Sequence, residues 1–187
     1  LRYKLNRAYS NLIKEEQSVG FACAQVDVAC HSMGGLTVRR WAKEEAFYTN
    51  DNTFGSEGLI NSLVTIGTPH FGTPVSDRIL ESWCLPIVCS IFPDLGLMKE
   101  ALYETRVLSS AICDLGVTHI MSHAISGEHS PGIWSDASKY DLDMLKLLEF
   151  MQALGCMSSP DILFGDDKHD GFIPAPSSAG GLADSPL

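Results

Sequence analysis

The stretch Val26-Asp27-Val28-Ala29-Cys30-His31-Ser32-Met33-Gly34-Gly35 joins a predicted strand to a predicted helix through one serine. Apolar residues alternate with other residues from Val26 to Cys30, which predicts a short strand. Residues 36–48 contain helix formers and no proline. Ser32 therefore lies on a sharp turn, which requires small residues two positions before and after it. Gly34 meets this requirement, whereas Cys30 replaces the first glycine of the G-x-S-x-G pattern with a residue that has a side chain.

Two further blocks follow along the chain. Residues 59–66 are predicted to form a buried strand, and they lead directly into Gly67-Thr68-Pro69-His70-Phe71-Gly72. Near the C-terminus stands Asp170-Gly171-Phe172-Ile173-Pro174, with Ser177-Ser178-Ala179 close behind. Three blocks spread over the chain are more specific than one serine motif, whose bland interpretation is a helix N-cap at Ser32.

In this order the three blocks resemble bacterial lipases related to the Pseudomonas and Burkholderia enzymes, which belong to the α/β-hydrolase family. The first block resembles their nucleophile elbow, the second their G-T-P-H-x-G segment, and the third the region that carries the acid of the catalytic triad. The resemblance implies an α/β-hydrolase fold, in the α/β class, with a mostly parallel sheet, flanking helices and a helical cap or lid.

The resemblance also assigns chemical roles. Ser32 is the expected nucleophile, Asp170 the expected acid, and the backbone N–H of Met33 one donor of the oxyanion hole. A serine needs an imidazole to take its proton, and in this fold that histidine follows the acid along the chain. No histidine follows Asp170, so we expect the base beyond Leu187 and interpret residues 1–187 as part of a hydrolase domain from a longer enzyme. This segment alone should hydrolyse esters negligibly.

An alternative triad keeps the chain order within the sequence. His169 would then be the base, with Asp136, Asp141 or Asp143 as the acid. This alternative leaves the resemblance around Asp170 without a role.

We expect the other histidines to have structural rather than catalytic roles. His70 could act as the base only by breaking the chain order of the fold, and we expect it to shape the rim of the pocket. His31 and Gly34 both lie inside the elbow. We expect the His31 side chain to pack or hydrogen-bond beside the turn. His119 and His123 fall on one face of a strand predicted over residues 117–127, too far apart to share a metal, and are interpreted as structural.

The region between the second and third blocks is expected to supply the cap. Residues 76–116 are too apolar for an ordinary loop and are predicted to form a cap or lid; the alternative is a pair of core helices packed on the sheet. Residues 129–160 are predicted to be a helical insertion, with apolar residues at helical spacing.

The composition of the chain limits the classes of partner that we expect. The net charge of −10 makes nucleic acid an unexpected partner and gives no attraction to an anionic membrane, so contact with a lipid interface would be apolar. No run of apolar residues is long enough for a transmembrane helix. No cofactor is expected, although Asp161, Asp166 and Asp167 are a candidate calcium cluster. The 6 cysteines leave the compartment open, and the resemblance favours secretion. Cys84 and Cys89 either close a small disulfide loop or are buried as small hydrophobic residues.

The expected function is hydrolysis of carboxylic esters, acylglycerols or other lipid esters, through an acyl-enzyme on Ser32. Acyltransferases, thioesterases and deacylases use the same elbow and stay open as alternatives. A non-catalytic binding module is a further alternative, and Cys30 in place of glycine is the feature that favours it.

Overall fold

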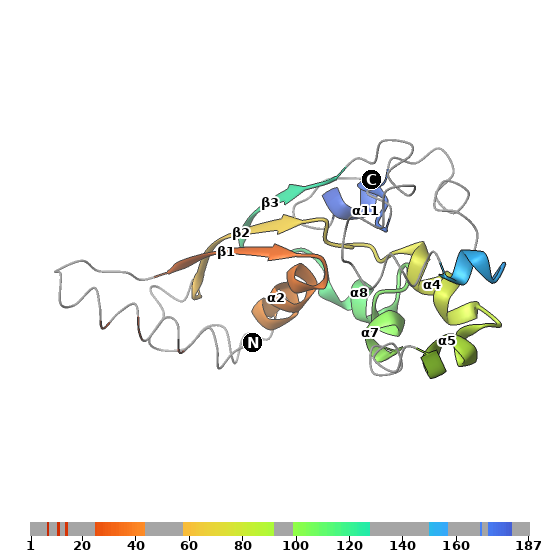
Figure 1. Ribbon diagram of the computed structural model, residues 1–187. Helices are drawn as coiled ribbons and strands as arrows, with labels where there is room; N and C mark the ends of the chain where they lie inside the picture. Colours follow the sequence, from red (N-terminus) through yellow and green to blue (C-terminus); the bar gives the residue numbers. More distant parts are fainter. Residues whose placement is uncertain are drawn as a thin grey trace.

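Three parallel strands form the centre of the molecule (Figure 1). They are β1 (Val26–His31), β2 (Ile60–Ile66) and β3 (Met121–Ile125), paired in the order β1-β2-β3. The computed structural model describes residues 25–43, 58–91, 99–127, 150–156 and 172–180, together with Arg7, Asn11, Lys14 and His169. The predicted α/β class, with a parallel sheet and flanking helices, is confirmed. Among the described residues, none of the helices is both long and apolar enough to cross a membrane.

Helix α2 (Met33–Lys43) connects β1 to β2 and covers one face of the sheet (Figure 1). Its buried Val38 and Trp41 pack with Leu63 of β2 in an apolar cluster, which we call the sheet core. Leu59, Ile60 and Ile120 complete its buried members. The predicted alternation in β1 is confirmed. Its odd-numbered residues are exposed, and its even-numbered residues are half-buried against the sheet core.

The opposite face of the sheet is exposed in the part of the chain that the structure describes. Ile66, Met121 and Ile125 are large apolar residues with exposed side chains on this face. The register pairs Ile66 with both His31 and Ile125, which places these three residues in one row across the sheet. Parallel sheets are usually covered on both faces, so this open face is unusual.

A second group of helices lies beyond the carboxyl ends of the strands. It comprises α4 (Pro74–Glu81), α5 (Leu85–Ile91), α7 (Lys99–Glu104) and α8 (Ser110–Leu115). Thr73 caps α4 by accepting the N–H of Val75, and Pro74 stands at the first helical position, where its missing N–H is harmless. Of the predicted cap segment 76–116, the structure describes residues 76–91 and 99–116, which contain these short helices; we use the name cap for them.

These helices have an apolar cluster of their own, the cap core. Its buried residues are Val75, Ile79, Cys84, Val88, Leu102 and Met151. A disulfide joins Cys84 to Cys156 across 72 residues of sequence and fixes residues 150–156 against α4 and α5. Of the two alternatives for Cys84 and Cys89, a disulfide between them is wrong, because Cys84 has Cys156 as its partner and Cys89 is a free thiol.

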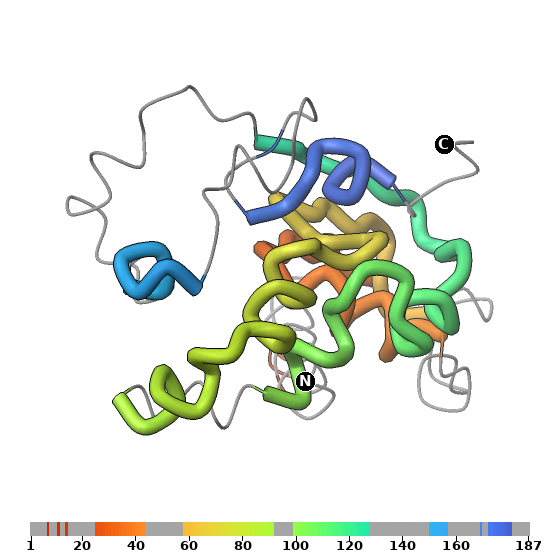
Figure 2. Tube along the Cα trace, turned by 90° about the vertical axis from the view of Figure 1, so that its right-hand side faces the viewer, coloured from red at the N-terminus to blue at the C-terminus, as the bar shows by residue number. Residues whose placement is uncertain are grey.

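The last described segment docks onto the sheet. Helix α11 (Ala175–Ala179) lies beside β3, as Figure 2 shows, and the Ser178 hydroxyl donates a hydrogen bond to the Ser126 hydroxyl. Residues 175–180, although rich in small residues, therefore pack against the sheet.

Other predicted elements are shorter than expected or lie outside the described residues. The strand predicted over 117–127 spans only Met121–Ile125, so His119 precedes it, and both His119 and His123 are exposed. Of the predicted insertion 129–160, only residues 150–156 are described, and they begin with a short helix.

Candidate active site

The backbone at Ser32 is left-handed, with φ of 51°. Ser32 stands between the end of β1 and the start of α2, at the predicted turn. A non-glycine residue with positive φ is uncommon and is often found at functional sites. An N-cap serine has an extended backbone instead, so Ser32 does not have the conformation of a cap.

Hydrogen bonds hold this conformation from both sides. The Ser32 N–H donates to the carbonyl of Ile66 at 3.0 Å. The Ser32 carbonyl accepts from the Gly35 N–H at 3.2 Å and from the Thr68 hydroxyl at 2.8 Å. Two of these three partners belong to the end of β2 and the loop after it, so the second sequence block fixes the turn in the first.

The close approach at the elbow falls on Gly35 rather than on Gly34. A Cβ at Gly34 would lie 3.5 Å from the Cβ of Cys30, which is an ordinary contact. The cysteine therefore fits where the motif usually has glycine. A Cβ at Gly35 would lie 2.5 Å from the Thr68 hydroxyl oxygen and 2.9 Å from the Thr65 methyl carbon. Sequence reasoning missed Gly35, because the pattern directs attention to the residue two positions after the serine.

Met33 is the first residue of α2, as expected for an oxyanion donor. The N–H groups of the first helical turn have no partner within the helix, and the helix dipole favours negative charge there. Its side chain is exposed and lines a groove between α2, α7 and α8. The backbone of Met33 can therefore offer a hydrogen bond to an oxygen held beside Ser32.

His70 is buried rather than placed at a rim. It is 1 % exposed, and Arg39 beside it is 4 % exposed. A guanidinium nitrogen of Arg39 lies 2.8 Å from His70 Nδ1, and the Thr65 hydroxyl lies 3.0 Å from His70 Nε2. Because arginine can only donate, Nδ1 is the acceptor, and Nε2 carries the proton and donates to Thr65.

This environment keeps His70 neutral. Burial, and then the neighbouring charge of Arg39, lower the pKa of His70 to about 3. Burial also lowers the pKa of Arg39 to about 10. The basic lone pair of His70 is occupied by Arg39, so His70 is a poor candidate for a general base. The expectation of a pocket-rim role is corrected: His70 joins α2 to the loop after β2. Arg39 was missed because an arginine in an amphipathic helix gives no local signal of burial.

The third sequence block contacts the loop that follows β2. Residues 67–73, which we call the 67–73 loop, form three hydrogen bonds with Ser177 of α11. The His70 N–H donates to the Ser177 carbonyl at 3.0 Å, the Phe71 N–H donates to the Ser177 hydroxyl at 3.1 Å, and that hydroxyl donates to the Gly72 carbonyl at 2.7 Å. The Thr73 hydroxyl bonds to the carbonyl of Phe172. The 67–73 loop therefore contacts both the serine turn and the segment that follows Asp170.

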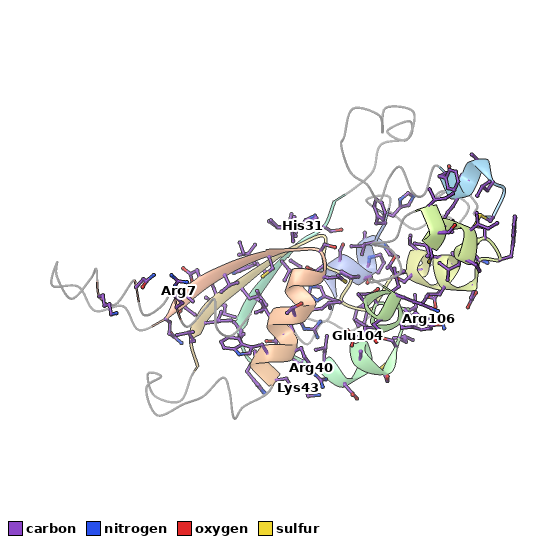
Figure 3. All side chains as sticks on the ribbon, turned by 60° about the horizontal axis from the view of Figure 1, so that its bottom comes forward. Arg7, His31, Arg40, Lys43, Glu104 and Arg106 are labelled. Atoms are coloured by element: carbon purple, nitrogen blue, oxygen red, sulfur yellow. A yellow bond between two sulfur atoms is a disulfide. The ribbon has the colours of Figure 1, made fainter. Side chains whose placement is uncertain are left out.

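Several candidate residues are outside the described part of the chain. These are Asp170 itself, the acids Asp136, Asp141 and Asp143, and the proposed calcium ligands Asp161, Asp166 and Asp167. His169 is described; it is buried and forms an isolated bridge with Pro174. His31 is exposed at the end of β1, on the face of the sheet away from α2 (Figure 3). Within the described ranges, no group of three potential ligands could hold a metal ion.

A groove of about 750 Å³ lies between α2, α7 and α8. Met33, the residue after Ser32, is among its lining residues, and the walls are largely apolar. The residues of this elbow groove are Met33, Leu36, Thr37, Arg40, Trp41, Ala101, Glu104, Thr105, Ser110, Ala111, Ile112, Asp114 and Leu115. Figure 3 shows Arg40 on α2 and Glu104 on α7 at neighbouring positions.

Comparison with known proteins adds no relative. No protein-family model matches this chain, and no curated protein matches it at a significant level. The functional argument therefore rests on the residues and the geometry above.

Proposed function

We propose that this chain carries the nucleophile of a serine hydrolase of the α/β-hydrolase type, which cleaves carboxylic esters through an acyl-enzyme on Ser32. The observation that carries the proposal is the strained backbone of Ser32, held by the 67–73 loop, which also binds the segment following Asp170. Three blocks that are far apart in sequence are thus joined through the 67–73 loop, which bonds to the backbone of Ser32 on one side and to Ser177 on the other. A helix cap or a plain strand-to-helix connection would not require this convergence.

In the proposed reaction, Ser32 Oγ attacks the ester carbonyl carbon while a histidine base takes the hydroxyl proton. The carbonyl oxygen becomes an oxyanion, which the Met33 N–H stabilises at the positive end of α2. The carbon–oxygen bond to the alcohol then breaks, and the base returns the proton to that alcohol. Water repeats the sequence on the acyl-enzyme and releases the acid, while Asp170 orients the base.

Lipid esters are the proposed substrate class. The cap carries exposed large apolar side chains, namely Trp83, Ile87 and Ile91, and the whole of α5 lacks charged residues. Such a surface suits an uncharged lipid phase better than water. We also propose that the protein matures in an oxidising compartment, because disulfides persist there and the cap contains one.

Labelling of the full-length protein with a fluorophosphonate tests the proposal. Ser32 should be modified rapidly, Ser32→Ala should abolish labelling and ester turnover, and Ser90→Ala, at an exposed cap serine, should change neither. Asp170→Asn should lower turnover by on the order of ten-thousandfold, because a histidine base loses its orienting carboxylate. Absence of modification at Ser32 would refute the proposal.

The binding-module alternative loses its one supporting feature. Cys30 makes an ordinary contact with the position of Gly34, so it does not disturb the turn. Acyltransfer and thioester cleavage share the acyl-enzyme; product analysis with added alcohol or thioester distinguishes them from ester hydrolysis.

A further inference from the structure

One face of α2 packs against the end of β2 and the 67–73 loop. Gly35 and Arg39 are four positions apart, so they share this face of the helix, and both are buried. At Gly35 the helix comes so close that a Cβ would lie 2.5 Å from the Thr68 hydroxyl oxygen. Glycine has no side chain, so this contact brings the helix near without fixing its rotation. The directional contact on this face comes from Arg39, one helical turn further along.

The Arg39 guanidinium binds two other segments at once. One terminal nitrogen lies 2.8 Å from His70 Nδ1, and the other donates to the carbonyl of Gly116, at the end of α8. Within the described ranges, Arg39 forms no ion pair with a carboxylate, and its Nε has no hydrogen-bond partner. Burying a charge without a carboxylate is unfavourable, so an apolar side chain would fill this space at a lower cost. What the arginine adds here is two hydrogen bonds with fixed directions.

His70 connects Arg39 to the serine turn. Its Nε2–H donates to the Thr65 hydroxyl at 3.0 Å. The residue after Thr65 is Ile66, whose carbonyl accepts the Ser32 N–H. The backbone N–H of His70 donates to the Thr68 carbonyl at 2.9 Å, and the Thr68 hydroxyl donates to the Ser32 carbonyl. Two of the groups that hold the serine backbone are therefore linked to His70.

We infer that Arg39 and His70 are positioning residues for the proposed reaction. Together they set the rotation of α2 and thereby the direction of the Met33 N–H, the candidate oxyanion donor. This inference rests on the proposed function and deepens it. Both side chains are buried, so they act on the substrate only through the backbone of the turn. Because Met33 is the first residue of α2, a rotation of the helix turns its N–H away from the oxyanion, and a misplacement of about 1 Å can lower a rate about a hundredfold.

Arg39→Lys in the full-length protein is the direct test. Lysine keeps the charge, but its single nitrogen cannot take the places of two guanidinium nitrogens. With p-nitrophenyl acetate, kcat should fall by at least about tenfold and KM should stay within about twofold, because transition-state stabilisation is lost and substrate binding is not. Arg78→Lys, the same replacement at an exposed arginine of α4, should change neither. A kcat for Arg39→Lys within about twofold of the wild type would overturn the inference.

Substitutions at His70 separate positioning from packing. Glutamine has an acceptor and two donors, so His70→Gln can accept from Arg39 and donate to Thr65, whereas His70→Leu can do neither. His70→Gln should keep kcat within about threefold of the wild type, and His70→Leu should lower it by at least about tenfold. Equal losses of kcat in the two variants would overturn the inference.

A double variant, Arg39→Met with His70→Leu, removes both partners of the buried hydrogen bond. Its urea midpoint should be higher than that of His70→Leu alone, because the guanidinium is no longer left buried without its acceptor. Its kcat should remain at least about tenfold below that of the wild type. Recovery of kcat together with stability would overturn the inference, because it would show that apolar packing alone orients the helix.

Amide hydrogen exchange distinguishes this inference from the proposed function. Arg39→Lys should lower the protection of the Ser32 and Gly35 amides by at least about tenfold and leave that of Leu63, in the middle of β2, unchanged. If these amides lose protection although a fluorophosphonate never modifies Ser32 in the wild type, the proposed function fails and the pair still orients α2. If the wild type is modified rapidly and Arg39→Lys is modified at the same rate, the inference fails and the function stands.

Discussion

The serine turn and the cap are held by different forces. Backbone hydrogen bonds and the buried trio Arg39, His70 and Thr65 fix the turn against β2 and the 67–73 loop. The cap core consists of apolar contacts between short helices, closed by one covalent bond between Cys84 and Cys156. The two sets of interactions share no residue, so we expect the geometry around Ser32 to survive a loss of the cap core and the cap to depend on its long-range cross-link.

Loss of the disulfide should have the largest effect. Cross-linking a loop of 72 residues stabilises a fold by about 4 kcal/mol in the chain-entropy description. Paired replacement by Cys84→Ser and Cys156→Ser should therefore lower the free energy of unfolding by several kcal/mol, measured by urea titration. Hydrogen exchange should show the loss of protection in α4, α5 and residues 150–156, while β1 and β2 keep theirs.

Replacement of an unpaired thiol is the control for that experiment. Cys113→Ser, at an exposed free cysteine, should change neither stability nor exchange. Equal loss of protection in β1 and in α5 would contradict the separation between the two regions, because it would show that the sheet unfolds together with the cap.

Two adjacent glycines offer a sharper test on the side of the turn. Gly35→Ala places a methyl group 2.5 Å from the Thr68 hydroxyl, and this overpacking should cost about 1–3 kcal/mol of unfolding free energy. Gly34→Ala makes only an ordinary contact and lies in a helix, where alanine is favoured by up to about 1 kcal/mol. Thermal or urea unfolding of both variants measures the difference.

A greater loss of unfolding free energy in Gly34→Ala than in Gly35→Ala would contradict the observed packing. It would mean that the helix approaches the strand most closely at the motif position, Gly34. The serine-labelling rate should follow the same order, since Gly35→Ala displaces Thr68 from the Ser32 carbonyl. Gly34→Ala should label at close to the rate of the wild type.

The sequence predicts the serine side better than the cap. The alternation in β1 and the glycines after Ser32 are local signals, so the strand, the turn and the following helix could be predicted from neighbouring residues. The partner of Cys84 could not, because six cysteines allow many pairings and nothing local marks Cys156. Burial of Arg39 and His70 was also invisible, because it depends on a loop that meets α2 only after the sheet has formed.

The buried histidine predicts a dependence of stability on pH. The pKa of His70 is about 3 in the folded protein and near 6.5 when unfolded, so the unfolded chain binds more protons between these values. His70 therefore imposes no cost above about pH 6.5 and lowers the unfolding free energy as the pH decreases toward 3, by at most about 1.4 kcal/mol per pH unit. His70→Gln should flatten this part of the profile in urea titrations at pH 5 and pH 7.

An exposed histidine provides the control for the His70 variant, because carboxylates also titrate at low pH and contribute to the slope in every variant. His119→Gln should leave the slope between pH 5 and pH 7 as it is in the wild type. A slope that His70→Gln does not alter would contradict the buried neutral state of His70.

The smallest effect is expected where the two regions meet. Arg106 lies beside the 67–73 loop, and its side chain donates to Asp77 at 2.5 Å and to Glu81 at 2.9 Å. These groups are partly exposed, and such ion pairs contribute about 0.2–1 kcal/mol. Asp77→Asn should therefore lower the unfolding free energy by less than about 1 kcal/mol, and Glu81→Gln by less still, because Asp77 also accepts the Val107 N–H.

Added salt should lower the unfolding free energy of the wild type toward that of these variants, because salt screens the exposed charges. The junction should otherwise persist, because the Thr73 N–H donates to the Thr105 carbonyl at 2.9 Å and the Leu108 N–H donates to the Phe71 carbonyl at 3.1 Å, independently of any charge. A loss of several kcal/mol in Asp77→Asn, or a changed labelling rate at Ser32, would show that the ion pair transmits cap structure to the serine turn. The backbone bonds at this junction predict that it does not.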